Sequence, residues 1–117
     1  MEIGTEEYRR LEVHARRIAV QQSEAIGLAA IRLDCGCIHY CGVSFTGDPV
    51  GPLTRLSVDN APAAICLKCR RPDDRLSHRI EDRLMIWPGR PEEWPEPELR
   101  KLIAHKVFGD NYRETAG

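Results

Sequence analysis

Four of the five cysteines fall into two short pairs, and these pairs are the residues best suited to chemistry. Cys35 and Cys37 are separated by one glycine, and Cys66 and Cys69 by two residues. Tetrahedral zinc takes four soft ligands at about 2.3 Å, and two cysteines on a tight turn supply two of them. Gly36 allows the turn that brings its two neighbours together. We therefore expect Cys35, Cys37, Cys66 and Cys69 to hold one structural zinc, with iron as the alternative metal.

Two residues close to the first pair are alternative ligands. If residues 37–41 form a strand, Cys37, His39 and Cys41 lie on one face, so either His39 or Cys41 could replace Cys35. The simpler interpretation makes Cys41 a small core residue and His39 a partly exposed strand residue. Cys41, or a labile metal, would also suit a thiol redox or metal sensor, which is the alternative function.

The layout of the cysteine pairs resembles the zinc-ribbon class, in which two cysteine turns on short hairpins hold one structural zinc. The resemblance covers residues 31–71, and the first pair departs from the usual Cys-x-x-Cys spacing. Zinc contributes roughly 10–16 kcal/mol of apparent binding free energy to small zinc peptides. A whole domain has a net stability of only ~5–15 kcal/mol. We therefore expect the metal to decide whether this small unit folds.

Basic residues gather after the second cysteine pair. Lys68, Arg70 and Arg71 flank that pair, where cations offset the negative charge of a zinc bound by four thiolates. The predicted binding residues are five arginines: Arg70, Arg71, Arg75, Arg79 and Arg83. Four of them recur every fourth residue and would line one face of a helix. This face is either a solvated surface with ion pairs or a binding site for nucleic acid or an acidic protein.

The sequence lacks the residues that zinc enzymes need. A zinc deaminase places a catalytic Glu two residues after a ligand, but no Glu occurs between Glu24 and Glu81. Pro72 follows Cys69 too closely for the helix that a thioredoxin-type Cys-x-x-Cys begins. Four thiolates also leave no open position on zinc. We therefore predict no catalytic residues and a small, non-enzymatic regulatory or adaptor protein.

Length, net charge and the absence of long apolar runs restrict the kinds of partner and the cellular location that we expect. A chain of 117 residues fits one domain with a modest core. Its 17 Lys and Arg against 18 Asp and Glu give a net charge of −1, which excludes binding to nucleic acid mainly by bulk charge. No apolar run approaches the ~20 residues that span a bilayer. We expect a cytoplasmic protein that contacts no membrane and has no small-molecule substrate.

The residues above must be positioned by the elements of a single domain, residues 1–117. We expect an α+β fold: an N-terminal amphipathic helix within residues 5–27, a small antiparallel zinc-ribbon-like β unit over residues 28–71, and two C-terminal helices within residues 72–109. Residues 110–117 would be a tail.

The N-terminal helix carries an apolar seam at alternating spacings of three and four residues. Thr5 is the expected N-cap, and Gly27 is the stop signal. The seam comprises Tyr8, Leu11, Ala15, Ile18, Gln22 and Ala25. It either packs on the core of its own chain or forms a two-helix contact, and we predict a homodimer through it.

Short runs of apolar residues, and the glycines and prolines that break them, predict the later elements. Residues 28–58 predict two or three short antiparallel strands, with a turn over residues 47–49. Residues 73–86 predict a helix, because leucine and isoleucine recur every fourth residue. Residues 87–97 hold four prolines and two tryptophans and predict an extended connector. Its tryptophans either fold back on the core or form a docking edge, and a last helix follows over residues 98–108.

Overall fold

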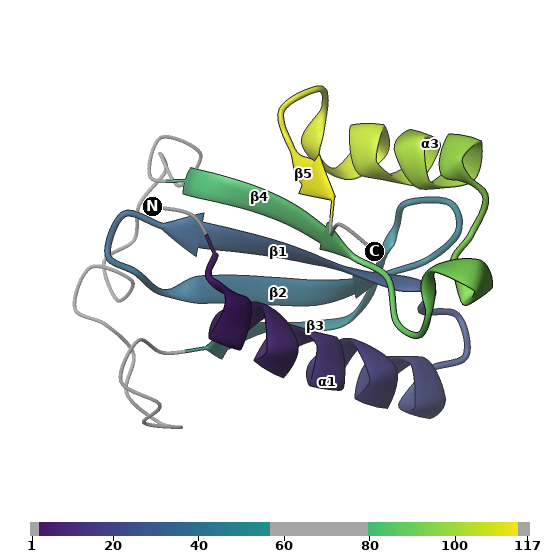
Figure 1. The fold of residues 1–117 in the computed structure, drawn as a ribbon, viewed down its shortest axis with the longest axis horizontal. Coiled ribbons are helices and arrows are strands. Elements are labelled where there is room, and N and C mark those ends of the chain that lie inside the picture. The colour runs from purple at the N-terminus through teal and green to yellow at the C-terminus, as the bar shows by residue number, and fades with distance from the viewer. Residues whose placement is uncertain (1–2, 57–79, 115–117) are drawn as a thin grey trace.

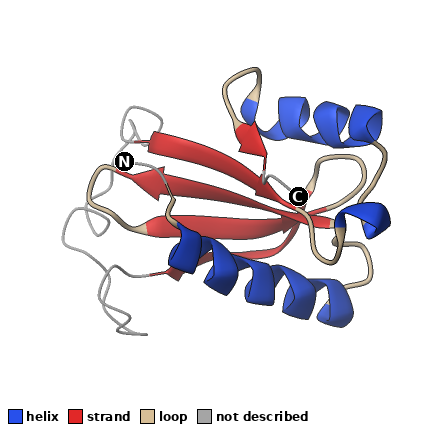
Figure 2. Ribbon diagram, in the orientation of Figure 1, coloured by secondary structure: helices blue, strands red, loops and turns tan. Residues whose placement is uncertain are grey.

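The structure is a computed structural model that describes residues 3–56 and 80–114. A mixed sheet of five strands lies between two α-helices (Figures 1 and 2). The elements in chain order are α1 (Thr5–Gln21), β1 (Gly27–Leu33), β2 (Ile38–Val43), β3 (Pro49–Leu56), β4 (Ile80–Ile86), a short 3-10 helix η2 (Pro91–Glu93), α3 (Pro97–Phe108) and β5 (Arg113–Glu114).

The strand order in the sheet is β3-β2-β1-β4-β5. The first three strands form an antiparallel meander. Strand β4 pairs antiparallel with β1, along the edge of β1 that does not pair with β2. The short strand β5 adds to β4 in a parallel direction, and this is why the sheet is mixed. The expected antiparallel strands within residues 28–58 are therefore present, but they belong to a larger sheet than a zinc ribbon.

Helix α1 covers one face of this sheet. Its N-cap is Gly4 rather than Thr5, and the Glu7 carboxylate accepts a hydrogen bond from the Gly4 amide at 3.1 Å. Leu11 and Ala15 are buried, and Tyr8 packs against the same cluster. The helix ends at Gln21, not at the predicted stop Gly27, so Gln22 and Ala25 of the predicted seam lie outside it. The helical part of the seam packs against the sheet of its own chain. The homodimer stays a prediction, without this seam as its interface.

The sheet has an apolar cluster on each face, as strand β4 makes clear. Leu84 and Ile86 belong to the cluster under α1, whereas Met85 and the following Trp87 belong to the cluster under α3. Successive residues of a strand point to opposite faces. Strand β4 is therefore buried on both sides, and the two helices lie on opposite faces of the sheet.

The predicted helix over residues 73–86 is wrong where the structure describes it. Residues Ile80–Ile86 form β4, and residues 57–79 lie outside the described part of the chain. Asp82, Leu84 and Ile86 occupy every second position of β4 and point to the same face. The sequence did not reveal this strand periodicity, because Asp82 is charged and was not expected to point inward. The carboxylate is buried because Arg113 and the amide of Ile3 satisfy it. One helix, not two, follows the sheet among the described residues.

The connector and the last helix agree with expectation more closely. Residues 87–96 form an extended connector interrupted only by η2. Trp87 is fully buried and Trp94 packs against the same cluster, so both tryptophans fold back on the core. Helix α3 ends at Gly109, which has a φ of 75°. The predicted tail begins instead with a turn that returns the chain to the sheet as β5.

Candidate metal centre

The first cysteine pair lies on the tight turn between β1 and β2. The amide of Gly36 donates to the Leu33 carbonyl, and the amide of Leu33 donates to the Cys37 carbonyl, each at 2.9 Å. Gly36 has a φ of 91°, a left-handed conformation that side chains with a Cβ rarely adopt. The turn therefore fixes the backbone of Cys35 and Cys37, with Cys37 buried and Cys35 half-buried. The predicted role of Gly36 agrees with this geometry.

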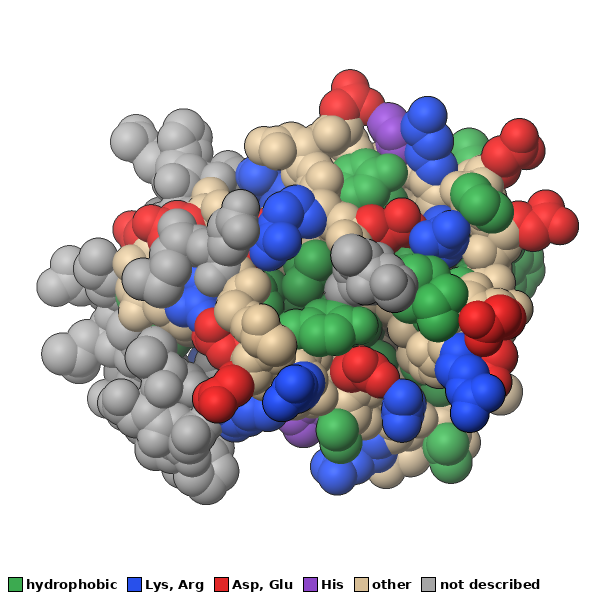
Figure 3. Space-filling model, viewed as in Figure 1, with side chains coloured by type: hydrophobic (Ala, Val, Ile, Leu, Met, Phe, Trp, Pro, Cys, Tyr) green, Lys and Arg blue, Asp and Glu red, His purple; other side chains and the backbone are tan. Residues whose placement is uncertain are grey.

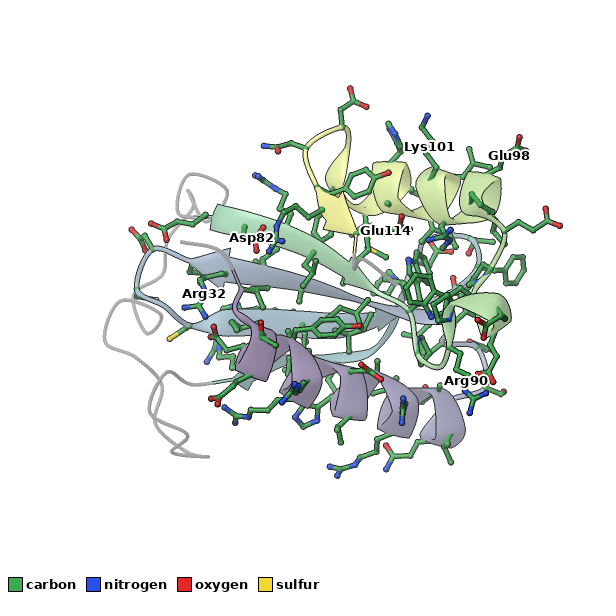
Figure 4. The ribbon with its side chains drawn as sticks, viewed as in Figure 1. Arg32, Asp82, Arg90, Glu98, Lys101 and Glu114 are labelled. Atoms are coloured by element: carbon green, nitrogen blue, oxygen red, sulfur yellow. The ribbon has the colours of Figure 1, made fainter. Side chains whose placement is uncertain are left out.

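A buried arginine connects the cysteine turn to helix α1 by a hydrogen bond and an ion pair. Arg32 is only 4% exposed, and its guanidinium donates to the Gly36 carbonyl at 3.2 Å. The same guanidinium forms an ion pair with Glu7, whose other oxygen caps the helix. Figure 4 shows Arg32 at this end of the sheet, beside the first turn of α1.

Sequence reasoning missed Arg32. Its signal is the alternation of Leu28, Ala30 and Arg32, which places an arginine in the inward phase of a strand that otherwise points apolar residues to the core. An inward charge is uncommon unless it has a partner. Its position just before the Cys35 turn would have indicated a role in holding that turn.

The second cysteine pair lies outside the described residues, but both ends of the segment that carries it are placed. Strand β3 ends at Leu56, which pairs with Ile38 just after the cysteine turn. Strand β4 begins at Ile80, which pairs with Leu33 just before that turn. The end of β3, the cysteine turn and the start of β4 therefore meet at one end of the sheet (Figure 1). Leu56 and Ile80, the described residues on either side of this segment, therefore lie on the two sides of the turn that carries Cys35 and Cys37.

The two alternative ligands occupy the strand that follows the turn. Ile38 and Tyr40 face the core under α1, so His39 and Cys41 point to the opposite face. His39 is 5% exposed, not the partly exposed residue that we expected. Cys41 lies four residues beyond Cys37, roughly 13 Å along a strand. That separation is too long for both thiolates to bind one tetrahedral metal at about 2.3 Å.

The environment of Cys41 is that of a packed thiol. Its Sγ lies 3.7 Å from the Val50 carbonyl and 3.6 Å from the Gly51 carbonyl, as a weak donor to both. Burial raises the pKa of the Cys41 thiol, and the bond to Val50 only partly opposes this shift. A raised pKa lowers the thiolate fraction at neutral pH, which disfavours a redox switch at this position.

Within residues 3–56 and 80–114, no three side chains of His, Cys, Asp or Glu gather to hold a metal. Two of the four predicted ligands, Cys66 and Cys69, lie outside these ranges, so the four-cysteine site stays a prediction.

The predicted arginine face does not continue through the described part of the chain. Arg83 lies on β4 opposite Ile31 of β1, so it does not follow Arg79 on the face of a helix. The other four arginines, Arg70, Arg71, Arg75 and Arg79, lie outside the described residues. On the visible face, acidic and basic side chains alternate over the described surface (Figure 3).

Comparison of the chain with protein-family models, with curated proteins and with solved structures finds no match. Of the helices in the described ranges, neither α1 nor α3 is long and apolar enough to cross a membrane.

Proposed function

We propose that this protein is a small, non-enzymatic zinc-binding adaptor or regulatory protein. Cys35 and Cys37 would hold a structural zinc together with Cys66 and Cys69. The observation that carries the proposal is the pairing of Leu56 and Ile80 on the two sides of the cysteine turn.

The lengths of chain allow the two pairs to meet. Cys66 follows Leu56 by ten residues, and Cys69 precedes Ile80 by eleven. An extended chain spans at most about 3.3–3.6 Å per residue, so each half of the segment can cover up to roughly 35 Å. Both halves start beside the turn, and either can therefore return to it. A zinc there would close the segment on the sheet.

Coordination by four thiolates argues against catalysis. A structural zinc site is closed, whereas a catalytic zinc keeps a position for water or substrate. Lys68 and Arg70 near the second pair would offset the negative charge of such a centre. In the cytoplasm, where we place the protein, thiols stay reduced and available to metal.

For a partner we propose an acidic protein surface. Basic residues cluster in the sequence from Lys68 to Arg83, and the net charge of −1 offers no broad positive field. Nucleic acid is bound mainly through many phosphate contacts, which require such a field. A local basic cluster beside a zinc centre suits a short acidic segment better.

Native mass spectrometry of the full chain tests the zinc. We expect one zinc per chain in the wild type and in Cys41→Ser, and none in Cys37→Ser or Cys69→Ser. Cys41→Ser is the matched control, because it removes a thiol that the geometry places too far from the turn. Zinc retained in Cys69→Ser, or no metal in the wild type, would contradict the proposal. The same spectra give the oligomeric mass and so test the homodimer.

Binding to an acidic peptide and to single-stranded and double-stranded oligonucleotides tests the partner. We expect binding to the peptide, with a loss of about tenfold or more when Arg70 and Arg71 are replaced by Gln. Tighter binding to an oligonucleotide than to the peptide would overturn the choice of partner without affecting the zinc.

A further inference from the structure

A groove separates the second half of α1 from strand β3, away from the cysteine turn. It has a volume of about 250 Å³. The helix contributes His14, Arg17 and Gln21, and Gln22 follows at its end. The sheet side is formed by Tyr40 of β2 and by residues 50–52 and Thr54 of β3. The groove thus combines one aromatic pair, one guanidinium and two side-chain amides.

An aromatic pair forms part of its wall. The ring of His14 stacks on the ring of Tyr40, with centroids 5.1 Å apart and an interplanar angle of 24°. Tyr40 is only 5% exposed, and its hydroxyl is hydrogen-bonded to the Thr54 side chain. The pair and its bond to β3 hold this wall in one arrangement before any ligand arrives, which reduces the entropy lost on binding.

The electrostatic character of the groove is positive. Burial lowers the pKa of His14, and the guanidinium charges of Arg17 and then Arg10 lower it further. The same two arginines act on Tyr40, whose pKa burial nevertheless raises. The residues that β3 contributes, 50–52 and Thr54, carry no charge.

Arg17 is the cation best placed to meet a ligand. Its guanidinium forms no ion pair with any residue in the described ranges, and the side chain is exposed. Two carboxylates of the helix already have partners, because Glu7 pairs with Arg32 and Glu12 with Arg16. The charge of Arg17 has no ion-pair partner within the described residues.

We propose that this groove is a binding site for a small oxyanion, a carboxylate or a phosphate ester, with Arg17 as its counter-ion. The amides of Gln21 and Gln22 supply hydrogen-bond donors, and the stacked His14 and Tyr40 supply an aromatic wall. Ligand pockets usually measure 300–1,000 Å³, so this volume restricts the ligand to a small molecule. The site is separate from the proposed zinc centre and does not depend on it.

NMR titration of the ¹⁵N-labelled full chain tests the site, in a buffer free of phosphate and carboxylate. The probes are inorganic phosphate, phenyl phosphate and benzoate, so that the three arms separate phosphate from carboxylate and measure the contribution of the ring. We expect shift changes confined to the amides of residues 14–22 and 50–54. Phenyl phosphate should bind more tightly than inorganic phosphate because the aromatic wall adds contact area.

Arg17→Gln should weaken binding about tenfold or more, the effect of losing one charge-assisted hydrogen bond. Arg16→Gln is the matched control, because it removes the same charge from the next residue, which lines a different groove. Both side chains are exposed, so both variants should fold. In the wild type, a bound anion should raise the pKa of His14, because it screens the fields of Arg17 and Arg10.

Three results would overturn the site. One is equal weakening by Arg17→Gln and Arg16→Gln, which indicates attraction by net charge alone. Another is a pattern of shift changes spread over the whole surface. The third is binding of a single-stranded oligonucleotide with no response to phosphate, phenyl phosphate or benzoate at millimolar concentrations.

Discussion

The two ends of the sheet are stabilised by different means. At the end near α3, Trp87 is fully buried among Met85 and Ile103, and its indole N–H donates to Glu114 at 2.9 Å. At the cysteine end, buried charges lie side by side: Arg32 is 4% exposed, and Asp82 opposite it on β4 is 6% exposed.

The two ends therefore depend on their contacts in different ways. Apolar packing is non-directional, so the cost of losing a side chain there grows with the area that the side chain buries. A buried charge depends instead on a specific partner, because it is costly unless that partner is present. Arg32 depends on Glu7, and Asp82 depends on Arg113 and the amide of Ile3. The cysteine end therefore depends on specific charged partners.

The largest expected effect belongs to the tryptophan end. Trp87→Ala should lower the free energy of unfolding by about 3–5 kcal/mol, because it removes a fully buried ring and leaves a cavity. Urea titration followed by circular dichroism measures the change. Trp94→Ala is the control and should cost clearly less, because this ring is only partly buried. Equal losses in the two variants would contradict the central place given to Trp87.

At the cysteine end, Asp82→Ala should lower the free energy of unfolding by about 2 kcal/mol. The variant removes an acceptor that Arg113 contacts at 3.0 and 2.5 Å and the Ile3 amide at 2.8 Å. The figure is below that for a fully buried pair, because the Arg113 side chain is 42% exposed. Urea titration again measures it.

The control for Asp82 is Asp48→Ala, which breaks the ion pair with Lys106 at the exposed β2–β3 turn. Solvent screens that pair, so its loss should be clearly smaller. An equal loss in both variants would mean that burial does not distinguish the two ends.

Acid should weaken the same contact. Burial alone would raise the pKa of Asp82, but hydrogen bonds from Arg113 and the Ile3 amide outweigh burial and hold this pKa below its ordinary value. A carboxyl with a lowered folded-state pKa contributes stability above its unfolded value of about 3.9. That stability is lost as the pH falls through the folded-state pKa.

We therefore expect wild-type stability to fall more steeply below about pH 4 than that of Asp82→Asn. Melting temperatures at half-unit pH steps give the two slopes. Parallel slopes would show that Asp82 is not the linked group.

The smallest effect concerns the Cys41 thiol, which lies where the pairing of β2 with β3 shifts register. Since burial raises the pKa of Cys41, iodoacetamide should alkylate it more slowly at pH 7.5 than it alkylates free cysteine. Mass spectrometry of the zinc-loaded protein follows this single thiol. Alkylation faster than that of free cysteine would restore Cys41 as a candidate redox switch.

Local signals in the sequence predicted the elements that depend on local chemistry. The N-terminal helix, the antiparallel strands within residues 28–58 and the last helix follow from turn residues and short apolar runs, although the predicted N-cap at Thr5 and helix stop at Gly27 are wrong. The turn at Gly36 follows in the same way. Each of these depends on residues within a few positions of one another.

The errors lie where a partner is distant in sequence. Asp82 reads as a solvent-exposed residue of a helix until Arg113, 31 positions later, is known to contact it. Arg32 likewise requires Glu7 from another element. The groove beside Arg17 could not be predicted, because Tyr40 and Thr54 reach it from two different strands. Pattern and propensity carry no information on such pairs.

The anchoring of Asp82 also has a consequence for biosynthesis. One carboxylate on β4 accepts bonds from residue 3 and from residue 113, so the buried charge is compensated only after both have been synthesised. Until Arg113 is available, strand β4 would bring an uncompensated carboxylate to β1. We expect the meander of β1 to β3 to form first on the nascent chain, with β4 docking only after Arg113 has left the exit tunnel.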